Sequence, residues 1–225
     1  MTPRLIPILH LASPQLPVGG FAYSQGLEAA VGAGLVTDEG SAGAWIQGVL
    51  DASLARLEAP LLAGLVVAWR DGEAAEVERL NGLFAASRET AELLDETGRM
   101  GKALQVWLRD LGVAADGDLV LLDRLRPLTY PAAFACAAAA LGLRVEETVT
   151  AYLWAWLENQ VMAAVKLVPL GQTAGQRLLL GLGPELPPLA QQAVDWPESE
   201  WSGLAPGLAI LSSRHETQYS RLFRS

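Results

Sequence analysis

The chain has 225 residues, of which 51% are hydrophobic and 18% are charged, and its formal net charge is −9. This length allows one large domain or two small ones, with enough apolar residues for a substantial core. Only two lysines, Lys102 and Lys166, occur in this acidic chain. Both features argue against nucleic-acid binding, which needs many cations to displace counterions from phosphates.

Apolar residues recur at helical spacing along most of the chain. The first patterns, in chain order, cover residues 24–36, 41–69, 74–87 and 87–112. A helix that starts at Ser24 would place Leu27, Val31 and Leu35 on one face. Pro60 interrupts the second pattern and favours a break or a new first turn, because proline lacks the amide that an inner helical position donates.

The second half of the chain continues in the same way. Residues 130–142 form a short pattern with Pro131 in its first turn, and residues 144–168 are apolar around the whole circumference, as in a central helix buried by its neighbours. Pro169 and Gly171 interrupt the next stretch, and residues 183–196 suggest a loop that leads into one more helix. We expect an all-α fold, a single-domain irregular helical bundle of about eight to ten helices.

The residue types needed for several kinds of chemistry are scarce. The two histidines, His10 and His215, lie at opposite ends of the sequence, and Cys136 is the single cysteine, so no Cys/His metal cluster can be read from the spacing. No phosphate-binding GxxxxGK[ST] motif occurs, and Ser24 does not lie in a GxSxG motif. We therefore expect a binding protein rather than an enzyme, with no cofactor and no metal site.

The stretch closest to a membrane span is residues 150–172. It contains Glu158 and Lys166, so it has no run of about 18 uncharged apolar residues, and a buried helix fits better. The N-terminal stretch combines a short apolar run with prolines and lacks a convincing cleavage site. We expect a cytoplasmic protein.

Two inner stretches are unusual for simple connectors. Residues 13–28, SPQLPVGGFAYSQGLE, place Phe21 and Tyr23 between a Gly-Gly pair and a helix start; a loop that caps the bundle would be the structural alternative. Lys166 lies in the apolar run AAVKLVPLGQ, where its ammonium group must reach solvent, pair with an acid or face a partner.

The C-terminal stretch, SRHETQYSRLFRS, differs from the rest of the chain in charge. Residues 1–212 hold 13 basic and 24 acidic residues, whereas residues 213–225 hold three and one. Tyr219, Leu222 and Phe223 fall at i, i+3 and i+4, the spacing of one helix face. A frayed terminus is the ordinary explanation, but the pattern also fits a docking segment, with residues 1–212 as the domain and 213–225 as its tail.

Four segments together resemble the family of the urease accessory protein UreF. They are LASPQLPVGGFAYSQGLE, SRETAELLDETGRMGKAL, AAVKLVPLGQTAGQRLL and RHETQYSRLFRS, and they occur in the family's order along the whole chain. Two departures are Ala22, where the family often has a hydroxyl residue, and the lack of the histidine often found before the equivalent of Tyr130.

The resemblance implies an all-α, non-catalytic chaperone for nickel-dependent urease maturation. Proteins of this family bind the accessory protein UreD, called UreH in some systems, form homodimers and recruit the GTPase UreG. The assembly docks on apo-urease, and GTP hydrolysis by UreG is coupled to nickel insertion. No nucleic acid or membrane is implied.

The resemblance also suggests roles for particular residues. Tyr23, Glu28 and Lys166 would face UreG and control its GTPase activity. The tail would insert into UreD and become ordered on binding, through Arg214, His215, Glu216, Tyr219, Arg221, Leu222, Phe223 and Arg224.

Two other classes of protein remain open. A helical adaptor could dock on another protein or on an anionic membrane surface through the basic tail. An enzyme would need Tyr23, Glu28 and Lys166 to converge in a deep pocket rather than to lie on an exposed face.

Overall fold

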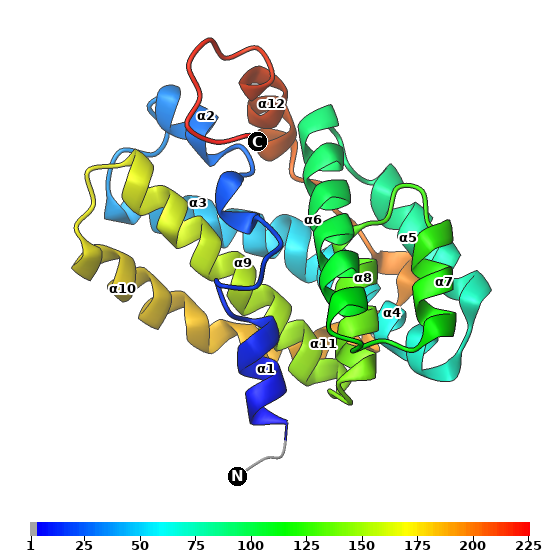
Figure 1. The fold of residues 1–225 in the computed structure, drawn as a ribbon. Helices are drawn as coiled ribbons and strands as arrows, with labels where there is room; N and C mark the ends of the chain where they lie inside the picture. The colour runs from blue at the N-terminus through cyan, green and yellow to red at the C-terminus, as the bar shows by residue number, and fades with distance from the viewer. Residues whose placement is uncertain (1–3) are drawn as a thin grey trace.

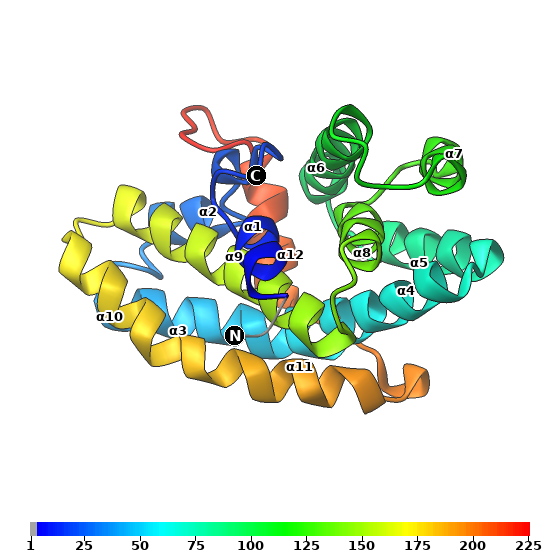
Figure 2. The same ribbon diagram turned by 60° about the horizontal axis from the view of Figure 1, so that its bottom comes forward.

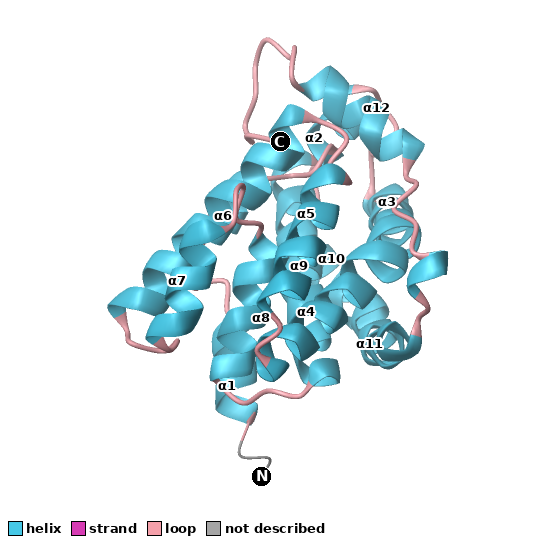
Figure 3. Ribbon diagram, turned by 90° about the vertical axis from the view of Figure 1, so that its right-hand side faces the viewer, coloured by secondary structure: helices cyan, strands magenta, loops and turns pink. Residues whose placement is uncertain are grey.

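The computed structural model describes residues 4–225, and its regular elements are helices joined by loops (Figures 1 and 3). The α-helices are α1 (Leu5–Leu11), α2 (Leu27–Gly32), α3 (Glu39–Val49), α4 (Ala59–Asp71), α5 (Ala74–Ala86), α6 (Ala91–Asp110), α7 (Asp116–Arg124), α8 (Tyr130–Ala140), α9 (Val145–Leu167), α10 (Gln172–Leu182), α11 (Leu186–Asp195) and α12 (Pro206–His215). No strand occurs in these residues, so the predicted all-α bundle is confirmed.

Helix α9 lies at the centre of the bundle, as its apolar circumference predicts. It packs against α4, α10 and α11, while α8 lies between α4 and α6 (Figure 2). Along α9, Leu153, Leu157 and Val161 are completely or almost completely buried, and Phe134 of α8 is also completely buried. The core is therefore continuous across the layers of helices.

Of the two outcomes expected at Pro60, a break or a new first turn, the structure has the second, and the helical path continues. Helix α3 continues through a π-helical segment, Leu50–Glu58, into α4, and Pro60 occupies the first turn of α4. The wider π turns precede the position where the proline amide is missing, so the helix changes its hydrogen-bonding pattern there. Residues Glu39–Asp71 are long and apolar enough to cross a membrane, but 72% of their most apolar window is buried inside the protein.

The helix predicted to start at Ser24 starts three residues later. Gln25 and Gly26 have φ angles of 50° and 77°, which lie in the left-handed region and cannot continue a right-handed helix. Helix α2 then begins at Leu27 and ends at Gly32, so Leu35 lies beyond the helix and is exposed.

Gly101 allows the close packing of α6 against the segment that leads into α8. A Cβ atom at this position would lie 2.4 Å from the carbonyl oxygen of Leu128 and 2.8 Å from the carbonyl carbon of Thr129. We expect Gly101→Ala to lower the free energy of unfolding by about 2 kcal/mol, since backbone atoms must move. Gly98→Ala is the matched control one turn earlier, where the nearest atom would lie 3.9 Å away. Urea unfolding should show Gly98→Ala to be neutral or stabilising, and equal effects of the two changes would contradict this explanation.

Candidate partner-docking site

The chain folds back on itself after α12. The last ten residues, 216–225, which we call the strap, leave α12 at His215 and return over α2 towards residues 19–26, which we call the signature loop (Figure 1). The domain boundary expected at residue 213 therefore falls inside the last turn of α12.

Glu28 holds the strap to α2. One of its carboxylate oxygens accepts a hydrogen bond from the backbone amide of Leu222 at 2.7 Å, and the other accepts one from the amide of Phe223 at 2.8 Å. The Glu28 side chain is almost completely buried. Charge-assisted hydrogen bonds of this kind are among the stronger ones in proteins.

A second anchor joins the end of α12 to α6. The His215 ring is completely buried, with Nδ1 2.7 Å from Glu92 Oε2 and Nε2 3.2 Å from Glu28 Oε2. The guanidinium group of Arg221 donates to the other oxygen of Glu92. The carboxylate of Glu216 accepts hydrogen bonds from the amides of Ala91 and Glu92, where it complements the N-terminus of α6.

The end of the strap pairs with the signature loop. The amide of Arg224 donates to the carbonyl of Ala22 at 2.7 Å, and the amide of Ser24 donates to the main-chain oxygen of Ser225 at 2.8 Å. The hydroxyl of Ser24 donates to that same oxygen. Gly26 allows this arrangement, because a Cβ there would lie 3.1 Å from Leu208 of α12 on a left-handed backbone.

Glu96 connects the strap to the interior. Its carboxyl group accepts hydrogen bonds of 2.7 Å from the hydroxyl of Ser225 and from the amide group of Gln25. Gln25 in turn accepts a hydrogen bond from the indole of Trp156 on α9. Burial raises the pKa of Glu96 to about 7, against an ordinary value of 4.5.

Lys166 lies beside the strap. Its ammonium group is 5.5 Å from the ring centre of Phe223 and 5.9 Å from that of Phe21, distances that fit cation–π interactions. Phe223 is buried and belongs to the hydrophobic core, whereas Phe21 is 41% exposed. Lys166 itself is exposed, so its charge can reach a partner.

The three residues expected to face UreG do not form one exposed surface. Tyr23 and Glu28 are buried, and burial raises the pKa of the Tyr23 hydroxyl group. Only Lys166 is exposed, and the aromatic residue exposed next to it is Phe21. The sequence pattern did not separate the two aromatic residues: Phe21 lies within the 3₁₀ turn Gly20–Ala22 and is exposed, whereas Tyr23 follows the turn and is buried.

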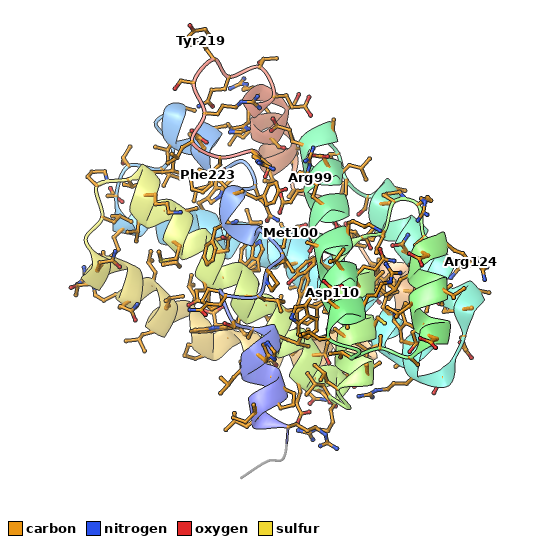
Figure 4. All side chains as sticks on the ribbon, viewed as in Figure 1. Arg99, Met100, Asp110, Arg124, Tyr219 and Phe223 are labelled. Atoms are coloured by element: carbon orange, nitrogen blue, oxygen red, sulfur yellow. The ribbon has the colours of Figure 1, made fainter. Side chains whose placement is uncertain are left out.

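The three apolar residues of the tail do not share a helix face either. The strap is not helical, and Figure 4 shows Tyr219 at its outer end. Tyr219 is completely exposed, Leu222 is 64% exposed, and Phe223 is buried. The helical arrangement predicted from their spacing is therefore wrong, because Glu28 binds the amides that a helix would use internally. The exposed members of the tail also include Arg214, Arg221 and Arg224.

A small cavity with both apolar and polar lining residues lies beside the signature loop. It has a volume of about 80 Å³, which is room for a few water molecules. Glu58, Arg88, Glu96 and Tyr152 contribute polar groups to its lining. None of Tyr23, Glu28 and Lys166 lines this cavity, so these residues do not converge in a deep pocket.

Several titratable side chains at this site contact one another. Within residues 4–225, no group of three or more His, Cys, Asp or Glu side chains is arranged to hold a metal ion. His215 uses both ring nitrogens on carboxylates, and His10 packs edge-on against Trp107 of α6. The fold and site thus define an all-α protein whose C-terminal strap packs against α2, α6 and the signature loop.

Comparison with known proteins gives the family. Residues 36–183 match the UreF family model. The chain is 57% identical to the urease accessory protein UreF of Azoarcus sp. (strain BH72), over 98% of this chain and 95% of that protein. It is 50% identical to the urease accessory protein UreF of Dechloromonas aromatica (strain RCB), over 99% of this chain and 98% of that protein. The chain belongs to the UreF family of urease accessory proteins.

One relative joins two accessory activities in a single chain. The bifunctional urease accessory protein UreEF of Bordetella bronchiseptica is 48% identical over 99% of this chain, which corresponds to 52% of that protein.

Proposed function

We propose that the chain is a chaperone of urease maturation that bridges UreD (UreH) and the GTPase UreG, and that couples GTP hydrolysis by UreG to nickel insertion into apo-urease. It acts as a cytoplasmic homodimer, and nickel is cargo of the assembly rather than a resident cofactor. Membership of the UreF family supports a role in urease maturation. The UreEF relative supports a close link to other accessory proteins.

The bridging role is supported by the strap, which has a fixed inner side and an exposed outer side. Its inner side is fixed by Glu28 and by the burial of Phe223, while Tyr219 and Leu222 point outward. Exposed aromatic and aliphatic side chains on a fixed backbone are suited to anchor a partner, because little conformational entropy is lost on binding. We propose that this outer side binds UreD.

The proposed contact with UreG lies on the neighbouring surface. Lys166 and Phe21 are exposed beside the buried end of the strap. Tyr23 and Glu28, which are buried, would act on UreG indirectly: Asn159 of α9 donates to the carbonyl of Tyr23, and Glu28 fixes the strap. A partner held on the strap and a GTPase held at Lys166 would then be close enough to influence each other.

One co-purification with UreD and UreG tests both contacts. The double change Tyr219→Ala with Leu222→Asp should abolish capture of UreD with unchanged helical content, because it alters only exposed side chains. Lys166→Ala should retain UreD but weaken UreG binding or change GTP turnover. Leu180→Asp, at another exposed position on α10, is the control and should retain both partners. Capture of UreD by the double variant, or unchanged UreG binding and GTP turnover with Lys166→Ala, would refute the corresponding assignment.

A further inference from the structure

Glu96 is a buried acid whose hydrogen-bond partners are neutral. Its carboxyl oxygens accept hydrogen bonds of 2.7 Å from the hydroxyl of Ser225 and from the amide group of Gln25, and its side chain lines the cavity beside the signature loop. The other acid in the lining, Glu58, is paired with Arg88 at 2.8 Å. Because buried charges are normally paired, Glu96 is the acid of this cavity that lacks a cation among residues 4–225.

Tyr130 contributes an unused hydroxyl group to the same cavity. This first residue of α8 lines the cavity and is only 9% exposed. Its backbone amide donates to the hydroxyl of Thr97 at 2.9 Å, but its own hydroxyl group forms no hydrogen bond within residues 4–225. Burial raises the pKa of this hydroxyl group well above its ordinary value. A buried hydroxyl group without a partner is costly, so Tyr130 points to an occupant of the cavity.

The unused hydrogen-bonding capacity of the lining consists mainly of acceptors. The two carboxylates keep free lone pairs, and the side-chain oxygen of Asn159 accepts no hydrogen bond within residues 4–225, since the amide nitrogen of that side chain donates to the carbonyl of Tyr23. Donors are fewer, namely the hydroxyl groups of Tyr130 and Thr97. The unpartnered Nε atom of Arg88 has almost no accessible surface, so it does not serve the cavity. Such a lining favours an occupant that donates hydrogen bonds.

The size and the walls of the cavity limit what can occupy it. Its volume of about 80 Å³ has room for an ion of about three non-hydrogen atoms. A divalent metal ion would need more oxygen or nitrogen ligands, and no group of three His, Cys, Asp or Glu side chains in residues 4–225 is arranged for one. Aromatic rings attract organic cations. The aromatic residues of the lining are Phe84, Tyr130, Tyr152 and Trp156.

We infer that the cavity binds a small organic ammonium ion, whose N–H groups donate to Glu96 and to the hydroxyl oxygen of Tyr130. The cation supplies the positive charge that Glu96 lacks. Its short alkyl group contacts the apolar residues of the lining, which are Phe84, Leu93, Met100 and Ala155. Burial raises the pKa of Glu96 to about 7, so near neutral pH a cation can take the place of its proton. The site is independent of the contacts proposed with UreD and UreG.

The methyl groups of the methionines report on this cavity. Met100 lines it, whereas Met162 on α9 does not. In protein with carbon-13 methionine methyl groups, at pH 8 and constant ionic strength, ethylammonium chloride that replaces sodium chloride should shift the Met100 resonance until the site is saturated and leave Met162 unchanged. Ethanol, which is similar in size but uncharged, should bind at least about tenfold more weakly, because it cannot pair with Glu96. No saturable shift of Met100, or equally tight binding of ethanol, would overturn the inference.

Two variants test the contacts with the cation. Glu96→Gln should weaken ethylammonium binding at least about tenfold, because a charge-assisted hydrogen bond is lost, and Glu89→Gln at an exposed position is its control. Tyr130→Phe keeps the ring, removes only the hydroxyl group and should weaken binding about three- to tenfold, with the exposed Tyr219→Phe as control. Circular dichroism checks that each variant keeps its helical content. Unchanged affinity in Glu96→Gln or in Tyr130→Phe would refute the assignment.

Discussion

Replacing Arg88 by methionine should lower the free energy of unfolding by about 3–5 kcal/mol, the usual cost of removing one member of a buried ion pair. The side chains of Arg88 and Glu58 are 9% and 7% exposed, and their charged groups are 2.8 Å apart. Tyr152 donates a further hydrogen bond to Glu58. Without the guanidinium group, the carboxylate would remain buried with only this one partner. Urea unfolding followed by circular dichroism at pH 7.5 measures the loss.

Two further variants show whether burial is the cause. Arg79→Met removes an exposed arginine that pairs with Glu76 and Glu198, and it should cost less than about 1 kcal/mol. Adding Glu58→Leu to Arg88→Met should restore much of the lost stability, because no buried charge is left unpaired. An Arg88→Met protein as stable as the Arg79→Met protein would show that the ion pair does not support the fold.

Glu96→Gln should remove a pH dependence of stability. The folded protein holds the Glu96 proton with a pKa of about 7, while the ordinary value is 4.5, so the folded state binds this proton more tightly than the unfolded state. The contribution of Glu96 to stability is therefore greatest below about pH 4.5, falls as the pH rises to about 7, and is constant above that. The total loss is about 3 kcal/mol. Glutamine cannot ionise and should abolish this loss.

Urea unfolding of the unaltered protein and of Glu96→Gln at several pH values between 4.5 and 8 measures this difference. Glu89→Gln, at an exposed position near the start of α6, is the control and should keep the dependence of the unaltered protein. Above pH 7, the Glu96→Gln protein should be the more stable one. If the free energy of unfolding changed with pH in the same way in the unaltered protein and in Glu96→Gln, the pKa of Glu96 would not be raised by folding.

Periodicity predicted the long helices well and the local interruptions poorly. The apolar circumference of residues 144–168 identified α9, since burial on all sides leaves no polar face. The start of α2 was missed because the left-handed angles of Gln25 and Gly26 are fixed by distant contacts with Glu96, Trp156 and α12. Helices α1 and α7 are too short for their periodicity to be distinctive.

The site could be predicted in part. The change of charge sign marked the C-terminal segment, and the motifs marked the signature loop, Glu28 and Lys166. The sequence did not reveal that Glu28 faces inward, because its partners Leu222 and Phe223 lie 194 and 195 residues away. Spacing rules describe neighbours on one element, and no such rule relates residues at this separation.

The pairing of Ser24 with Ser225 has a consequence for the order of folding. These residues are 201 positions apart, so the signature loop cannot form its final hydrogen bonds until the ribosome has released the strap. Contacts of such long range close late, because the entropy of the intervening chain must first be lost. The helical bundle can assemble before the strap has been made, whereas the surface around Lys166 and Phe223 is completed only after residues 216–225 have left the ribosome. A nascent chain that does not yet include residues 216–225 would therefore lack the finished surface.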